Sequence, residues 1–336
     1  MTMRREIGSE FWDTPTIDQK NSLFPESTQW FLSGRSALQA IIKELGEARS
    51  VSLPSWCCDS MIKPFVDSGL EVRFYPVYWS EGRLFQERSF DCDVLFLIDY
   101  FGYTGANPDL SGFKGKVIRD VTHSIFSTTY SDADYYFSSL RKWCGVWTGG
   151  YAWAKDGHRL HPEVVNDSKY VFLREKAMHQ KAEYISGQRE DKGYLQIFDE
   201  AEELLESVGS FTAADRDIQI AKKLDIETVK NRRRANAEIL RSAFPDWLIF
   251  SEQSPSVVPM FVPVLIPGGK RNELRRYLIN NEIYCPIHWP VSDFHRLDGK
   301  EQFIYDDELS LVCDQRYKEE DMHRMVETIK AFWKEA

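Results

Sequence analysis

The feature that most constrains the fold of this chain is a regular alternation of short apolar runs with amphipathic segments after residue 30. The run CDVLFLIDYFG at 92–102 is nearly all apolar, as expected for a strand buried on both faces of a parallel sheet. The segment SGRSALQAIIKEL at 33–45 has helical periodicity instead. This rhythm predicts an α/β fold, a mostly parallel sheet with helices on both faces. Further strands are predicted at 50–54, 70–77, 116–120, 134–139 and 149–155.

The chain has 336 residues, enough for a large domain and a smaller one. Residues 1–30 are polar and irregular, and we interpret them as an N-terminal arm. Residues 31–245 would form the large domain. Residues 246–336 read as strand, helix, strand and a terminal helix, which predicts a small C-terminal α+β domain.

Composition excludes several classes of protein. The net charge of −10 argues against a nucleic-acid binder, which would need a basic face. No apolar run approaches membrane-spanning length, and no signal-peptide pattern follows the N-terminus. The six cysteines lack the spacing of a metal site or a disulfide framework, so we expect no metal and a cytoplasmic location.

Polar residues stand at the ends of three predicted elements, where α/β sheets gather their ligands. Ser33, Gly34, Arg35 and Ser36 open the helix at 33–45, and free N–H groups at such an end bind phosphate. Taken alone, the same serines are more simply helix caps.

The other two ends follow strands. The strand 116–120 ends in Asp120, with His123 three residues later, although a carboxylate there can merely cap the next turn. The strand 134–139 ends in Ser138 and Ser139, and Lys142 follows three residues later. Lysine is usually a solvated surface residue, but the tryptophans and glycines that follow are unusual for a plain surface loop.

A phosphate cradle, a carboxylate and a lysine, in this order, match the needs of pyridoxal 5'-phosphate (PLP). The carboxylate keeps the pyridine nitrogen protonated, so that the ring accepts the electrons left by removal of a proton from Cα. The lysine forms the Schiff base and moves that proton between carbon atoms.

The successive segments SGRSAL, LPSW, IDYFG, VIRDVTHS and FSSLRKW…GG resemble the landmarks of the DegT/DnrJ/EryC1/StrS family. The resemblance implies fold type I, PLP-dependent amino transfer and a homodimer. It assigns Lys142 to the Schiff base, Asp120 to the ring nitrogen and His123 to the neighbourhood of the ring. It further implies that Gly34, Arg35, Ser36, Ser138 and Ser139 hold the phosphate and that Trp56 or Cys58 stacks on the ring.

The chain departs from the family pattern at Arg35, where a small hydroxyl residue is usual, and between 165 and 245, where the family's asparagine-containing segment is missing. For the substrate, Arg316 would bind a carboxylate and His288 would line the pocket. The alternatives remain open: Arg316 paired with Asp314 or Glu319, and His288 as an ordinary buried histidine.

The leading hypothesis is therefore a PLP-dependent aminotransferase acting on small molecules. Glutamate is the expected amino donor, and a nucleotide-linked keto-sugar or a non-sugar carbonyl compound is the acceptor. A racemase, lyase or acyl-transfer enzyme of the same fold would need the same lysine and aspartate. A descendant without enzymatic activity would be expected to have lost Lys142 or Asp120, and both are present.

Overall fold

A computed structural model describes residues 6–88, 90–103, 109–126, 132–163, 168–206, 209–297 and 299–335. Two compact units can be distinguished. Unit 1 consists of Glu6, Glu10–Gly46 and Ala133–Ile226, and unit 2 consists of Ile7–Ser9, Glu47–Asp132 and Glu227–Ala336. The domain boundaries predicted at 30 and 245 remain a prediction.

The central sheet is mostly parallel and has seven strands in the described part of the chain. Unit 1 contributes β2 (Gln29–Phe31), β10 (Gly150–Ala154) and β9 (Tyr135–Ser139), in this order, with antiparallel pairing. Unit 2 contributes β8 (Lys116–Asp120), β7 (Val94–Ile98), β3 (Ser50–Pro54) and β4 (Glu71–Tyr75), in this order, all parallel. The predicted fold class is confirmed.

Helix α1 (Gly34–Lys43) of unit 1 packs against β9 and β10. Apolar side chains recur on one of its faces with helical spacing and are buried there, which explains both its place and its stability. They are Ala37, Leu38, Ala40, Ile41 and Ile42. The short helix η1 (Leu140–Lys142) follows β9 directly.

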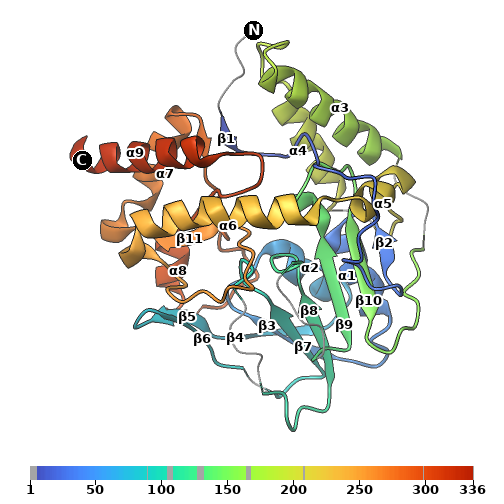
Figure 1. Cartoon of the computed structure of the whole chain (residues 1–336). Coiled ribbons are helices and arrows are strands. Elements are labelled where there is room, and N and C mark those ends of the chain that lie inside the picture. The colour runs from blue at the N-terminus through green and yellow to red at the C-terminus, as the bar shows by residue number, and fades with distance from the viewer. Residues whose placement is uncertain are drawn as a thin grey trace. The chain divides into compact units, whose positions relative to one another are not determined.

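The rest of unit 1 is helical. Helices α3 (Ser168–Ile185) and α4 (Tyr194–Leu204) lie side by side, and α5 (Asp215–Lys222) follows them in the chain (Figure 1). Two small apolar clusters hold α3 and α4 together, and Trp12 and Trp147 pack against one of them.

In unit 2, all five residues of β7 are buried, as the apolar run predicted. The register places Ile98 opposite Asp120, so β7 and β8 end together. Helix α2 (Asp59–Asp67) connects β3 to β4. The antiparallel hairpin of β5 (Val77–Ser80) and β6 (Arg83–Gln86) was not predicted from the sequence.

The remainder of unit 2 surrounds one large apolar core. Helix α6 (Ile226–Ala243) leads through η2 (Pro245–Trp247) to β11 (Val262–Leu265), which pairs with β13 (Glu308–Leu311). Between them lie η3 (Pro267–Gly269), α7 (Arg271–Asn280), β12 (Ile283–Tyr284) and α8 (Gln302–Asp307), and α9 (Glu319–Glu335) follows. Strand β12 pairs with β1 (Ile7–Gly8).

Two expectations for this part of the chain need correction. The second strand expected in the C-terminal region, IYCPIHW at 283–289, is only two residues long, because Pro286 cannot donate a ladder hydrogen bond. Strand β13 was missed. No described helix is long and apolar enough to cross a bilayer. The described residues contain no group of His, Cys, Asp and Glu arranged for a metal ion.

Candidate cofactor site

The first turn of α1 is capped by its own serines. The Ser33 backbone is extended, and its Oγ accepts a hydrogen bond from the Ser36 N–H at 3.2 Å. The hydroxyls of Ser33 and Ser36 lie 3.3 Å apart. Ser33 therefore caps the helix, which is the simpler role that the sequence offered for these serines. A cap satisfies only part of the first turn, so other N–H groups there can still bind an anion.

Glycines allow this turn to lie directly on the ends of β9 and β10. A Cβ atom at Gly34 would lie 3.3 Å from the Ser139 Cβ. At Gly150 it would lie 1.9 Å from the Ser33 carbonyl oxygen, so no side chain fits there. The N-terminus of α1 and the serines of β9 are thus brought together, as the phosphate-site prediction requires.

Ser138 supplies the polar group that a phosphate would need. Its side chain is fully buried, and its Oγ has no hydrogen-bond partner among the described residues. A buried hydroxyl without a partner costs roughly 1–3 kcal/mol, a cost that a phosphate oxygen would remove. Arg35 is half-buried in the same helical turn and forms no ion pair within the described chain. The residues present therefore fit a phosphate group.

The adjacent Arg141 and Lys142 have different environments. Arg141 Nη1 lies 2.5 Å from Glu202 Oε1, and its guanidinium lies 5.9 Å from the centre of the Tyr170 ring. Burial disfavours the charged form of Arg141, but Glu202 outweighs this effect and raises its pKa. Lys142 is half-buried and makes no hydrogen bond or ion pair with any residue that the structure describes. Its amine is available for chemistry.

The loop after Lys142 is closed by a backbone hydrogen bond. The Leu140 N–H donates to the Gly149 carbonyl at 2.8 Å, and Gly149 has a φ of +139°. This left-handed conformation strongly favours glycine. The Gly149-Gly150 pair therefore fixes both the lysine loop and the first turn of α1.

In unit 2, Asp120 and His123 lie at and just after the end of β8, and both are buried. Asp120 Oδ1 accepts a hydrogen bond from the Thr122 N–H at 2.8 Å. His123 Nδ1 accepts one from the Phe101 N–H at 3.3 Å. Because Nδ1 accepts, the neutral ring carries its proton on Nε2. The His123 ring stacks on Trp289 with the centroids 5.6 Å apart.

A buried ion pair that sequence reasoning missed supports this end of β8. Arg119 donates from Nε to Asp99 Oδ1 at 2.8 Å, and it also pairs with Asp132. Burial opposes the positive charge of Arg119, but Asp99 and Asp132 raise its pKa. Ser124 Oγ donates to the other oxygen of Asp99 at 2.5 Å. This network holds the loop that carries His123.

Trp56 and Cys58, the two candidates for ring stacking, have different surroundings. Trp56 is fully buried, stacks on Tyr100 at 4.7 Å and donates from Nε1 to the His288 carbonyl at 2.7 Å. Cys58 is partly exposed at the N-cap of α2, with its Sγ 2.9 Å from Ser60 Oγ. The stacking role remains a prediction for both.

His288 belongs to a buried relay that the sequence did not reveal. The Glu308 carboxylate accepts from the His288 N–H and from Ser310 Oγ, both at 2.6 Å. Ser310 Oγ in turn lies 2.8 Å from His288 Nδ1. When Ser310 donates to Glu308, His288 must donate from Nδ1, which leaves a lone pair on Nε2. Burial raises the pKa of Glu308 to about 8.

Arg316 is held by its neighbour Asp314. The guanidinium makes two hydrogen bonds to this carboxylate, at 2.9 and 2.8 Å, and a third to the Ser9 carbonyl at 3.1 Å. The structure therefore contains the Asp314 pair that the sequence offered as the alternative. The substrate role of Arg316 remains a prediction.

No protein-family model matches the chain, and no curated protein matches it either. Solved structures do match. A DegT DnrJ EryC1 StrS aminotransferase from Brucella abortus is 15% identical, with 91% of this chain and 85% of that chain covered and a TM-score of 0.58. The sugar aminotransferase CalS13 from Micromonospora echinospora is 14% identical, with 91% and 88% covered and a TM-score of 0.59.

Spr1654 from Streptococcus pneumoniae, in its PLP form, is 13% identical, with 90% of this chain and 86% of that chain covered and a TM-score of 0.58. The chain has the fold of these aminotransferases. The family resemblance seen in the sequence is thus confirmed at the level of the fold. Identities this low leave the roles of individual residues to be proposed from the chemistry of the site.

Proposed function

We propose that the chain binds PLP and transfers an amino group from an amino acid, with glutamate as the expected donor, to a keto substrate. One observation carries the proposal. In unit 1, Lys142 is half-buried, has no hydrogen-bond or ion-pair partner among the described residues, and directly follows two serines that lie against the first turn of α1. A lysine amine, a hydroxyl without a partner and helix N–H groups are the donor set that a phosphate-bearing aldehyde requires.

The proposed roles follow from these environments. The hydroxyl of Ser138 and the N–H groups of the first turn of α1 bind the phosphate, together with the Arg35 guanidinium. Lys142 holds the cofactor aldehyde and later moves a proton from the donor's Cα. PLP supplies a conjugated ring that accepts the electron pair left behind. Asp120 would keep the ring nitrogen protonated.

The acceptor that we propose is a nucleotide-linked keto-sugar. Support comes from the fold shared with the sugar aminotransferase CalS13. The proposed enzyme is a homodimer, because sites of this fold lie at subunit interfaces. Light scattering of the purified chain tests this part, and a monomeric mass contradicts it.

The test of cofactor binding is an absorbance titration with PLP. The wild-type chain should develop a near-visible band that Lys142→Ala lacks. Lys176→Ala, which removes an exposed lysine on α3, is the matched control and should keep the band. An unchanged band in Lys142→Ala would refute the assignment of the lysine.

The test of amino transfer is to mix the PLP-loaded chain with glutamate. The near-visible band should disappear while 2-oxoglutarate accumulates in equal amount. A stable band, with no 2-oxoglutarate, would argue for a racemase, lyase or acyl-transfer enzyme built on the same cofactor site.

A further inference from the structure

The buried relay of Glu308, Ser310 and His288 in unit 2 contains two hydrogen bonds around one hydroxyl group. Glu308 Oε1 lies 2.6 Å from Ser310 Oγ, and Ser310 Oγ lies 2.8 Å from His288 Nδ1. Each bond needs one hydrogen atom, and the hydroxyl has only one. The second hydrogen must come either from a protonated Glu308 or from His288 Nδ1. The relay therefore has two arrangements, and each of them satisfies both hydrogen bonds.

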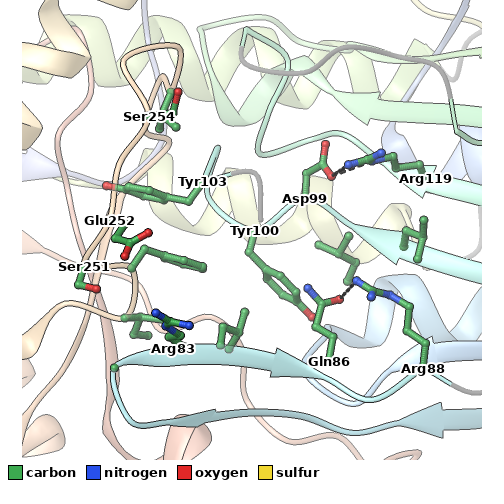
Figure 2. A pocket seen from close by; sticks show the side chains of 17 residues that line it. Arg83, Gln86, Arg88, Asp99, Tyr100, Tyr103, Arg119, Ser251, Glu252 and Ser254 are labelled. Atoms are coloured by element: carbon green, nitrogen blue, oxygen red, sulfur yellow. Dashed lines mark hydrogen bonds and ion pairs between the residues drawn. The ribbon is translucent and has the colours of Figure 1, made fainter. Parts of the chain in front are cut away.

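Two polar pairs elsewhere in unit 2 leave no such choice. Asp99 pairs with Arg119, and Gln86 pairs with Arg88, in the wall of a cavity of about 520 Å³ (Figure 2). An arginine only donates, so the direction of these hydrogen bonds is fixed. The three residues of the relay do not line that cavity. In the relay, the hydroxyl and the imidazole can each donate or accept, so the direction of its hydrogen bonds can reverse.

The surroundings of the relay favour a protonated Glu308 at neutral pH. Glu308 and Ser310 are fully buried, and His288 is nearly so. Burial raises the pKa of Glu308 to about 8, although the hydrogen bonds within the relay oppose this effect. The charge of Arg271, which donates to the Glu308 carbonyl at 3.0 Å, opposes it as well. The carboxyl group therefore changes its charge in a range where the fold can be studied.

Further titratable groups lie near the relay. Burial raises the pKa of the Cys285 thiol to about 12, so this thiol stays neutral around pH 8. Asp306 and Asp307, at the end of α8, precede the relay glutamate in the chain, and burial raises the pKa of Asp307. The rings of His123 and His288 have their centroids 5.6 Å apart. A test of the relay must therefore follow the His288 ring itself.

The geometry points to Glu308 as the residue that sets, through Ser310, which nitrogen of His288 carries a proton. When Glu308 is protonated, it donates to Ser310, the hydroxyl donates to Nδ1, and the neutral imidazole carries its proton on Nε2. When the relay loses one proton, Nε2 releases it, Nδ1 takes the hydroxyl proton, and Ser310 takes the proton of Glu308. The relay then carries one negative charge, on the carboxylate, and titrates as one unit.

This tautomer change alters what His288 offers to a ligand. With Glu308 protonated, Nε2 donates a hydrogen bond, as a carbonyl or phosphate oxygen requires. With Glu308 ionised, Nε2 accepts one, as a hydroxyl or ammonium group requires. A contact between His288 and the substrate rests on the proposed function, whereas the relay itself does not. Glu308 and Ser310 are thus positioning residues for His288.

NMR of the full chain with ¹⁵N-labelled histidine rings is the measurement, because protonated and unprotonated ring nitrogens have different ¹⁵N shifts. Spectra are recorded from about pH 6 to about pH 10, a range that includes the ordinary pKa of histidine. His288→Gln identifies the His288 signals by their absence. As the pH rises through about 8, Nε2 of His288 should lose its proton and Nδ1 should gain one.

Three variants locate the cause of the tautomer change. Glu308→Gln should keep the proton on Nε2 throughout, because its amide donates to Ser310 and cannot ionise, while its oxygen still accepts from the His288 N–H. Ser310→Ala should abolish the change although Glu308 is present. Asp307→Asn is the matched control, since it removes the neighbouring carboxylate, which lies outside the relay, and should leave the change near the same pH.

Three results would overturn the inference. The first is a His288 ring that keeps one tautomer over the whole range in the wild-type chain. The second is a tautomer change that Glu308→Gln leaves in place. The third is loss of the Nε2 proton with Nδ1 protonated throughout, since His288 would then titrate alone beside an ionised Glu308. Because no step of this test uses PLP or amino transfer, its failure is distinct from failure of the proposed function.

Discussion

Two of the lysines in unit 1, Lys181 and Lys142, have contrasting environments. Lys181 of α3 is fully buried, lies 3.1 Å from Glu6 Oε1 and has the rings of Trp12 and Tyr194 within 5.2 and 5.8 Å. Lys142 is half-buried, with no ion pair among the described residues. Lys181 has a structural role: its buried positive charge is stabilised by the ion pair with Glu6. Lys142 is half-buried, so its charge lowers the stability of the fold little, and its amine is available to a ligand.

The largest effect should come from Lys142. In Lys142→Ala, the rate of amino transfer should fall at least about a thousandfold, because the chain loses the residue that we propose as nucleophile and proton carrier. The free energy of unfolding should change by less than about 0.5 kcal/mol, as for a surface substitution. Rate assays measure the loss of amino transfer, and urea unfolding of the same preparation measures the free energy of unfolding. If Lys142→Ala were substantially destabilised, Lys142 would have a structural role as Lys181 does, and the difference proposed between the two lysines would be wrong.

The next largest effect should come from Lys181→Ala, which leaves the buried Glu6 with Lys192, at 3.2 Å, as its remaining ion-pair partner among the described residues. Removing one partner of a buried ion pair typically costs about 3–5 kcal/mol. Urea unfolding measures the loss, and PLP absorbance of the remaining folded protein should stay normal. A variant as stable as the wild type would show that the buried charge pair is dispensable.

Glu308 allows a pH-dependent test in unit 2. Its pKa of about 8 lies above the usual 4.5, so the folded state binds more protons than the unfolded state between these values. Its contribution to stability is therefore full below pH 4.5 and is lost as the pH rises towards 8, at most about 1.4 kcal/mol per pH unit. Glu308→Gln should remove this slope from unfolding curves measured between pH 5 and 8. If the slope of the free energy of unfolding against pH were unchanged in Glu308→Gln, titratable groups other than Glu308 would cause it.

The smallest effect should come from Ser138→Ala. Its buried hydroxyl has no partner among the described residues, so its removal should stabilise the cofactor-free chain by about 1 kcal/mol, the lower end of the cost of such a group. The affinity for PLP should fall about tenfold, for one charge-assisted hydrogen bond to phosphate. Absorbance titration measures this. Ser186→Ala, on an exposed turn after α3, is the control and should bind PLP normally.

Local pattern was sufficient to predict α1 and six of the seven described strands of the central sheet, because a buried parallel strand such as VLFLI and an amphipathic helix leave signals within a few residues. Strand β2 was missed, because it begins in the segment interpreted as an irregular N-terminal arm. The hairpin β5–β6 and strand β13 were missed because their sequences alternate too briefly to stand out. The assignment of three chain segments to a cofactor site, made from their order and spacing, remains a prediction.

Pairing across long sequence distances could not be predicted. Nothing near RKW shows that Arg141 binds Glu202, 61 residues away, while Lys142 has no ion pair within the described part of the chain. Similarly, the relay between His288 and Glu308 joins residues 20 apart through a short unpredicted strand. Such long-range contacts decide which polar residues have a structural role and which remain available to a ligand.

The most direct measurement is to add PLP, reduce with borohydride and locate the modified lysine by peptide mass spectrometry. Reduction makes the bond between the cofactor and its lysine permanent. The account predicts a pyridoxyl group on the peptide that contains Lys142 and none on the peptide that contains Lys181. A label on another lysine, or no label on the folded chain, would contradict it.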